Sequence, residues 1–160
     1  MILVIGEILF DLFEKEKQIG GAPFNFAYHL KNFGFPVRFI SRIGNDAHGR
    51  EIFKILEQHH FNIDDIQIDD KHDTGTVIVQ LSSSGNPTFH INTDVAYDYI
   101  SYLPKEHSTL IDMADFIYFG TLVQRSKLGF ENIQRFMLNR RSDTICFYDI
   151  NLRPDCYSDK

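Results

Sequence analysis

The chain has 160 residues, with 16 basic and 22 acidic side chains and a net charge of −6 at neutral pH. This length predicts one domain with a buried core, and the acidic balance without a basic run excludes nucleic acid and anionic membranes as main partners. The apolar start at residues 1–6 has no basic residue before it and is interrupted by Glu7, so we interpret it as a buried strand and not as a signal peptide or membrane span. Because Cys146 and Cys156 have neither metal nor redox spacing, we expect a cytoplasmic protein with reduced thiols.

Apolar strand-like stretches alternate with amphipathic helical stretches along most of the chain. Strands are predicted at residues 1–6, 8–13, 37–43, 66–68, 116–119 and 144–150, and helices at residues 23–33, 50–60, 108–114 and 128–141. This alternation predicts an α/β fold with a mainly parallel sheet. Ligands of such sheets bind beyond the carboxyl ends of the strands. The residues that follow apolar strands, and that we therefore expect to converge, are Asp11, Gly20, Gly21, Gly120, Thr121 and residues 149–153.

A glycine turn followed by a helix occupies residues 20–34, with the sequence GGAPFNFAYHLKNFG. The two glycines permit positive φ or a close approach to a ligand, and Pro23 suits the first helical turn. Phe26, Leu30 and Phe33 recur at helical spacing and predict the buried face, while Gly34 stands where a C-terminal capping glycine belongs. The free N–H groups and the amide of Asn25 at the helix start suit an oxygen-rich ligand. A tight connection into a core helix is the alternative interpretation. We expect the core to include Phe24, Phe26, Phe33, Phe116 and Phe119.

A second distinctive region reads as a β-hairpin. Residues 74–81 and 87–92 are strand-like and flank the turn-forming run SSSGN at residues 82–86. Phe89 and Ile91 alternate with polar neighbours, so one side of this strand should be covered and the other solvated. The hairpin is interpreted as a lid over a site, as a dimerisation surface, or as a plain edge hairpin.

Six short motifs occur in a characteristic order. They are GEILFD at residues 6–11, GGAPFNFA at 20–27 with Leu30 and Gly34 beyond it, IGNDAHG at 43–49, TGT at 74–76, DVAYD at 94–98 and DINLRP at 149–154. Together they resemble the motifs of the ribokinase-like (PfkB-type) carbohydrate kinases, and the last run is similar to the fructokinase and 2-keto-3-deoxygluconate kinase branches. The resemblance covers nearly the whole chain. It implies a ribokinase-like sheet flanked by helices, with a small β lid formed by residues 8–18 and 74–95.

The resemblance further implies ATP-dependent phosphorylation of a sugar hydroxyl with Mg²⁺, with fructose as the first substrate. The substrate-binding residues that it implies are Asp11, Gly20, Gly21, Asn25, Asp149, Asn151 and Arg153. Asp11 and Asn25 would bond sugar hydroxyls, and the guanidinium of Arg153 would meet a carboxylate or phosphate oxygen or brace the site. Lid closure would exclude water, and the hairpin would mediate a homodimer. No two histidines show a metal-site arrangement with carboxylates, so no metal ligand is assigned.

One departure separates this sequence from the family pattern. Family members are about twice as long, and their second half carries a D-T-x-G-A-G-D signature that supplies the catalytic aspartate, the anion hole and most of the ATP site. Nothing in this sequence corresponds to it; the run DTGT at residues 73–76 lacks the second glycine and the closing aspartate. We therefore expect residues 1–160 to be the N-terminal sugar-binding part, truncated before the nucleotide-binding half. This part would have no catalytic base, no activity by itself and an exposed apolar sheet edge.

Other interpretations remain open at this point. The chain could be a non-catalytic sugar-binding or regulatory remnant, or part of a 2-keto-3-deoxygluconate or nucleoside kinase. A dinucleotide-binding oxidoreductase is disfavoured because GEIL stands where G-x-G-x-x-G would follow the first strand. Residue by residue, Asp11 could be a polar residue of an edge strand, Asn25 could brace the helix start, and Arg153 could form a surface ion pair.

Overall fold

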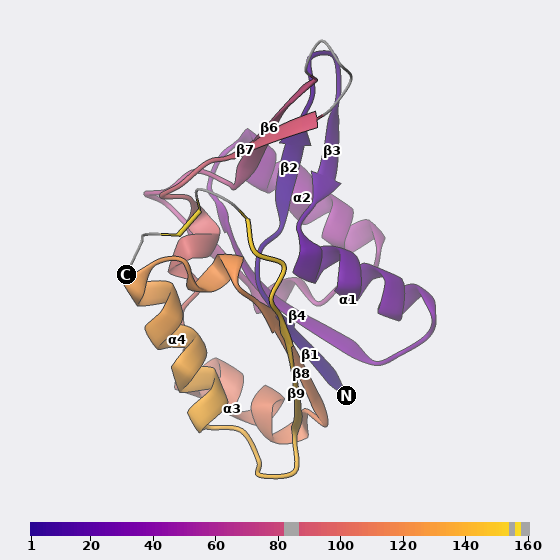
Figure 1. Ribbon diagram of the computed structural model, residues 1–160. Coiled ribbons are helices and arrows are strands. Elements are labelled where there is room, and N and C mark those ends of the chain that lie inside the picture. The colour runs from indigo at the N-terminus through magenta and orange to yellow at the C-terminus, as the bar shows by residue number, and fades with distance from the viewer. Residues whose placement is uncertain (82–86, 154–155, 158–160) are drawn as a thin grey trace.

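The computed structural model describes residues 1–81, 87–153 and 156–157, and it has a five-stranded parallel sheet, the large sheet, at its centre (Figure 1). The strand order is β5-β4-β1-β8-β9, with β1 at Ile2–Ile5, β4 at Val37–Gly44, β5 at Ile66–Asp69, β8 at Phe116–Gly120 and β9 at Ile145–Asp149. The connecting helices are α1 (Ala22–Asn32), α2 (Ala47–Gln58), α3 (Pro104–Met113) and α4 (Lys127–Leu138), with short 3-10 helices η1 (Ile63–Asp65), η2 (Ala96–Tyr99) and η3 (Leu122–Gln124). The predicted α/β class is confirmed.

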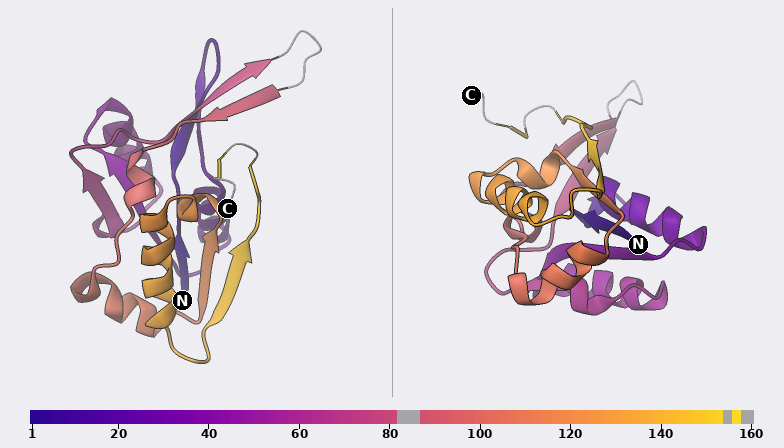
Figure 2. Two further views of the ribbon diagram at one scale, coloured as in Figure 1. Left: turned by 60° about the vertical axis from the view of Figure 1, so that its left-hand side comes forward. Right: turned by 90° about the horizontal axis from the view of Figure 1, so that it is seen from below.

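Helices cover both faces of the large sheet, with α1 and α2 on one face and α3 and α4 on the other (Figures 1 and 2). Side chains of β1 alternate between the two cores: Leu3 and Ile5 pack into the α3 and α4 core, and Val4 packs into the α1 and α2 core. A strand buried on both faces needs apolar side chains at every position. This burial explains why residues 1–6 are continuously apolar.

A second sheet of four strands, the small sheet, extends beyond the carboxyl ends of the large sheet (Figures 1 and 2). Its order is β3-β2-β6-β7, with β2 at Leu9–Leu12, β3 at Lys17–Gly20, β6 at Thr76–Leu81 and β7 at Pro87–Ile91. The predicted hairpin is present as the antiparallel pair β6 and β7, while its predicted turn at residues 82–86 lies outside the described residues. Strand β3 was not predicted, because the charged segment that leads into it has no apolar alternation and the strand is held by pairing with β2.

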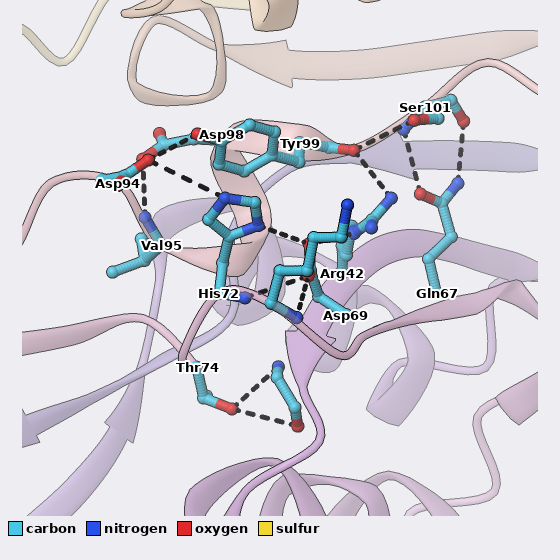
Figure 3. Close-up of polar contacts among 12 residues, drawn as sticks. Arg42, Gln67, Asp69, His72, Thr74, Asp94, Val95, Asp98, Tyr99 and Ser101 are labelled. Atoms are coloured by element: carbon cyan, nitrogen blue, oxygen red, sulfur yellow. Dashed lines mark hydrogen bonds and ion pairs between the residues drawn. The ribbon is translucent and has the colours of Figure 1, made fainter.

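Buried polar contacts hold the segment that leads from β5 into the small sheet (Figure 3). Asp69 is 1% exposed and accepts hydrogen bonds from Arg42 Nε at 2.7 Å and from the backbone N–H groups of Lys71 and His72. The ring of His72 also bonds Asp69 and stacks on Tyr99 with ring centroids 3.7 Å apart. Burial alone would raise the pKa of Asp69, but these donors together lower it to about 2. The segment is therefore fixed to β4 and η2.

A buried ion pair holds the segment that leaves the small sheet after β7. Arg125 donates from Nε and Nη2 to the two carboxylate oxygens of Asp98, both at 2.7 Å, and both side chains are at least 94% buried. The same Nη2 donates to the carbonyl oxygen of Asn92 at 2.7 Å. The guanidinium also lies 5.1 Å from the ring centroid of Tyr97. We call these two anchored segments, residues 69–75 and 92–99, the root of the small sheet.

The buried face of α1 matches the prediction in part: Phe26 and Leu30 are partly buried and pack against the core. Pro23, Phe24 and Ala27 are the buried residues of this helix, whereas Phe33 is 78% exposed. Phe33 is the C-cap residue, beyond the last turn that packs on the sheet, so the prediction that it lies in the core was wrong. Gly34 follows with φ of +84°, which agrees with the predicted capping glycine. The other helices match the predicted ones within a few residues, although α3 already begins at Pro104.

The edge strand β9 presents apolar side chains to solvent. Ile145 is 64% exposed, and Phe147 and Tyr148 are about half exposed at 48% and 49%. Phe147 also stacks with Tyr118, whose ring in turn stacks on Phe26 with centroids 4.2 Å apart. The predicted exposed apolar sheet edge is therefore present at β9.

Candidate functional site

A cavity of about 200 Å³ lies beyond the carboxyl ends of β1, β8 and β9, between the start of α1 and the small sheet. This is the edge at which open parallel sheets bind ligands. The predicted site residues that line it are Asp11, Gly21, Asn25, Asp149, Asn151 and Arg153. The expected convergence of segments far apart in the sequence is thus present, and Gly20 is the one predicted residue outside the lining.

The two glycines before α1 have different structural roles. Gly21 is the N-cap of α1 with φ of +107°, and a Cβ atom there would lie 2.5 Å from the carbonyl oxygen of Glu7. Only glycine fits this position, which brings the backbone of the helix start to the cavity. At Gly20, a Cβ atom would lie 2.5 Å from Oδ2 of Asp11. Gly20 therefore makes room for the Asp11 carboxylate.

Asp149, at the end of β9, is held in position by two donors. The hydroxyl of Tyr118 donates to Oδ2 at 2.5 Å, and the backbone N–H of Asn151 donates to Oδ1 at 3.2 Å. Burial and the bond to Asp149 raise the pKa of the Tyr118 phenol, so the phenol keeps its proton and remains a donor. The result is a carboxylate of fixed orientation at the cavity, while Asn151 and Arg153 beyond it are exposed.

Asp11 reaches the cavity from the small sheet. It lies on β2 opposite Val77 of β6, and it is half-buried. Burial raises the pKa of its carboxyl group, and the positive charge of Arg153 opposes that increase. Asp11 and Arg153 thus bring opposite charges to the lining of the same cavity, although they are 142 positions apart in the sequence.

Sequence reasoning missed Glu7, which lies at the floor of the cavity directly after β1. Glu7 is 5% exposed, and its Oε2 atom has no hydrogen-bond partner among the described residues. Burial raises its pKa to about 7, although bonds from the backbone N–H groups of Glu7 and Ala22 lower it. One feature of the sequence could have identified Glu7: it is an acidic residue that follows directly after a continuously apolar strand.

The small sheet supplies an apolar wall of the cavity. Val77 pairs with Ile91 and Val79 with Phe89, so these side chains share the face that points toward the cavity. Phe89 is nevertheless 57% exposed. The side of β7 that we expected to be covered therefore faces the cavity and is only partly covered by the described residues.

Acidic and histidine side chains also line a larger hollow of about 690 Å³ between the start of α2 and β7. Asp46 in this hollow already accepts hydrogen bonds from Gly49 and Thr74. Across the described parts of the chain, no group of three or more His, Cys, Asp or Glu residues is arranged to hold a metal ion. The same residues include no helix with the length and apolar character needed to cross a membrane.

Comparisons with known proteins agree with these features. The chain matches the pfkB family carbohydrate kinases over residues 2–154. It is 29% identical to PH1459 of Pyrococcus horikoshii, described as an uncharacterized sugar kinase, over 98% of this chain and 54% of that protein. It is 27% identical to a fructokinase of Salmonella typhimurium over 99% of this chain and 53% of that protein. The chain thus spans about half the length of these relatives.

Solved structures show the same fold. The structure of PH1459 in complex with ATP has a TM-score of 0.85 over 98% of this chain and 55% of that chain, at 28% identity. A fructokinase of Xylella fastidiosa with bound ATP also has a TM-score of 0.85, over 98% of this chain and 50% of that chain, at 21% identity. These findings are incompatible with the alternative of a dinucleotide-binding oxidoreductase. The protein belongs to the pfkB family of carbohydrate kinases and has the ribokinase-like α/β fold of that family.

Proposed function

We propose that this chain is the sugar-binding part of an ATP-dependent sugar kinase, with fructose as its first substrate. The observation that carries the proposal is the convergence of Asp11, Asn25 and Asp149 on one cavity at the carboxyl ends of parallel strands. Carboxylate and amide oxygens accept hydrogen bonds from hydroxyl groups, and amide N–H₂ groups donate to sugar oxygens. A sugar presents many such groups in a small volume, so its chemistry matches this lining.

Each side of the cavity would have its own part in binding. Asp11 and Asp149 would accept hydrogen bonds from hydroxyl groups on opposite sides of the sugar, and Asn25 would bond a further hydroxyl. The close backbone at Gly21 would allow the sugar to approach the start of α1. Arg153 would brace Asp11 or contact the sugar. The small sheet would act as a lid that excludes water when it closes.

ATP, when bound, supplies the phosphoryl group in this reaction class, and the family implies Mg²⁺ as its counterion. The described residues form no metal-binding group, and the sequence has no D-T-x-G-A-G-D signature, so we assign neither ion nor catalytic base to this chain. Our proposal for the 160-residue chain is sugar binding without phosphoryl transfer. The rival proposal of a non-catalytic sugar-binding module predicts the same for the isolated chain.

Titration calorimetry of the 160-residue chain tests the proposal. Fructose, 2-keto-3-deoxygluconate, ribose and adenosine would each be titrated with and without Mg·ATP. We expect fructose to bind with an affinity that is indifferent to Mg·ATP. Preferred binding of 2-keto-3-deoxygluconate or adenosine would identify the other kinase branches, and failure of all four ligands to bind would contradict the proposal.

The exposed side chains of the small sheet also support the proposal that it mediates a homodimer. Ile78 is 39% exposed and Phe89 is 57% exposed, on the two different faces of this sheet. Static light scattering would test it: we expect a dimer that Ile78→Ser converts to a monomer. A monomeric wild-type chain would contradict the proposed dimer.

A further inference from the structure

The charges around the cavity are predominantly acidic. Glu7, Asp11 and Asp149 all line it, and Arg153 is the only cation among the described lining residues. The three acids come from the floor after β1, from the small sheet and from the end of β9, so they surround the space on three sides. Any ligand in the cavity is therefore close to at least two carboxyl groups.

The nearby cations do not compensate for this acidity. Arg153 carries one positive charge against three acids in the lining, so it offsets the charge of at most one of them. Arg125 is close enough to influence Glu7, but both of its donor contacts to Asp98 are at 2.7 Å. An ion-paired guanidinium offers little net positive charge to a third group. The lining thus keeps an excess of negative charge.

Glu7 strengthens the effect because it is buried. Its Oε2 atom has no partner among the described residues, and with 5% of the residue exposed it is screened by solvent only weakly. Like charges repel more strongly in such a site than at the surface. An anionic ligand would force Glu7 to stay protonated or would lose binding energy to repulsion, whereas a neutral ligand would not be repelled in this way.

We propose that the cavity selects an uncharged sugar over a sugar acid or a sugar phosphate, and that Glu7 is a specificity-determining residue for this choice. The inference rests on the proposed function of the cavity as a sugar site. Selection of an uncharged sugar leaves no substrate carboxylate or phosphate for Arg153 to bind, which was one of the roles considered for it. Arg153 would instead orient Asp11.

Ligand pairs that differ in charge test the inference on the 160-residue chain. Calorimetry at pH 8 would compare fructose with fructose 6-phosphate, and 2-keto-3-deoxygluconate with its neutral carboxamide. We expect each neutral ligand to bind about tenfold or more tightly than its charged counterpart, because at least two carboxylates repel the anion. Equal or tighter binding of the charged member of both pairs would overturn the inference and leave the sugar-site proposal intact.

The variant Glu7→Gln tests the residue itself, since it removes the charge and keeps the size of the side chain. We expect the preference for neutral ligands to shrink at least about threefold. Glu131→Gln on α4, whose side chain is 46% exposed away from the cavity, is the matched control and should leave the preference unchanged. A folded Glu7→Gln protein with the wild-type preference would overturn the role of Glu7. If no sugar binds to the wild type, the proposed function itself fails, and this inference fails with it.

Discussion

The floor and the wall of the cavity differ in how firmly their side chains are held. At the floor, Glu7 is almost fully buried, Gly21 admits no Cβ atom, and the Asp149 carboxylate is oriented by Tyr118. At the wall, Phe89 is more than half exposed and Asp11 is only half-buried. The floor is part of the packed core of the large sheet, whereas the wall is a four-stranded sheet with buried inner strands, β2 and β6, and an exposed edge strand, β7.

Because the floor is held more firmly than the wall, the two sides of the cavity suit different roles in ligand binding. A floor fixed by core packing can present polar groups in one geometry without further ordering on binding. Within the wall, the edge strand β7 has mostly exposed side chains, and such segments open at low free-energy cost, as elements that close over ligands must. The root limits the motion of the wall, because residues 69–75 and 92–99 form the buried hydrogen bonds and ion pair that fix the wall to the large sheet.

The largest expected effect comes from breaking the root. Asp98→Ala leaves the buried guanidinium of Arg125 without its carboxylate partner, which should lower the free energy of unfolding by about 3–5 kcal/mol. Asp143→Ala is the control, because Asp143 pairs with Arg141 at an exposed site and should change little. Urea denaturation measures both variants. A loss below about 1 kcal/mol for Asp98→Ala would show that the ion pair does not anchor the wall.

The second prediction concerns the floor and depends on pH. The pKa of Glu7 is raised from 4.5 to about 7 in the folded protein, so folding favours the protonated form. Its contribution is fully present below pH 4.5 and is lost as the pH rises to about 7, which amounts to about 3 kcal/mol. Glu7→Gln should remove this dependence and make the protein more stable than wild type at pH 8. Denaturation of both proteins at pH 5 and pH 8 would reveal it; identical pH profiles would place the carboxyl group in a more polar environment.

The third prediction compares the wall with the floor in ligand binding. Asp11→Ala should weaken sugar binding by about 1–3 kcal/mol, because sugar hydroxyls would lose an acceptor. It should leave the melting temperature nearly unchanged, since Asp11 is half-buried and lies outside both cores. Calorimetry with fructose measures the affinity, with Asp112→Ala on the exposed side of α3 as the control. An unchanged affinity would remove Asp11 from the site.

The smallest effect is expected from the apolar part of the wall. Phe89→Ala should reduce the free energy of unfolding by less than about 1 kcal/mol, because this ring is 57% exposed. Phe24→Ala provides the comparison: this ring on the buried face of α1 is 2% exposed, and its loss should lower the free energy of unfolding by about 3–5 kcal/mol. Comparable losses for the two variants in urea would mean that the wall is packed as firmly as the core.

Periodicity predicted the elements of the large sheet well and those of the small sheet less completely. Strands buried on both faces, such as β1 and β8, leave a continuous apolar signal that requires no knowledge of their neighbours. β3 leaves no such signal, because its stability comes from pairing with β2. Helical spacing also could not predict that Phe33 is exposed, since it identifies one face of a helix but not the residue at which the packing of that face ends.

The sequence by itself determined the fold class, the family and six of the residues that line the cavity, because these depend on local patterns and on motifs in a fixed order. Only the tertiary structure decided that Gly20 makes room for Asp11, that Glu7 lies buried at the floor, and that Arg125 anchors the wall. Each of these depends on contacts between residues distant in the sequence or on burial by several elements at once. The burial of a polar side chain and the identity of its distant partners depend on its place in the fold, so no local pattern assigns them.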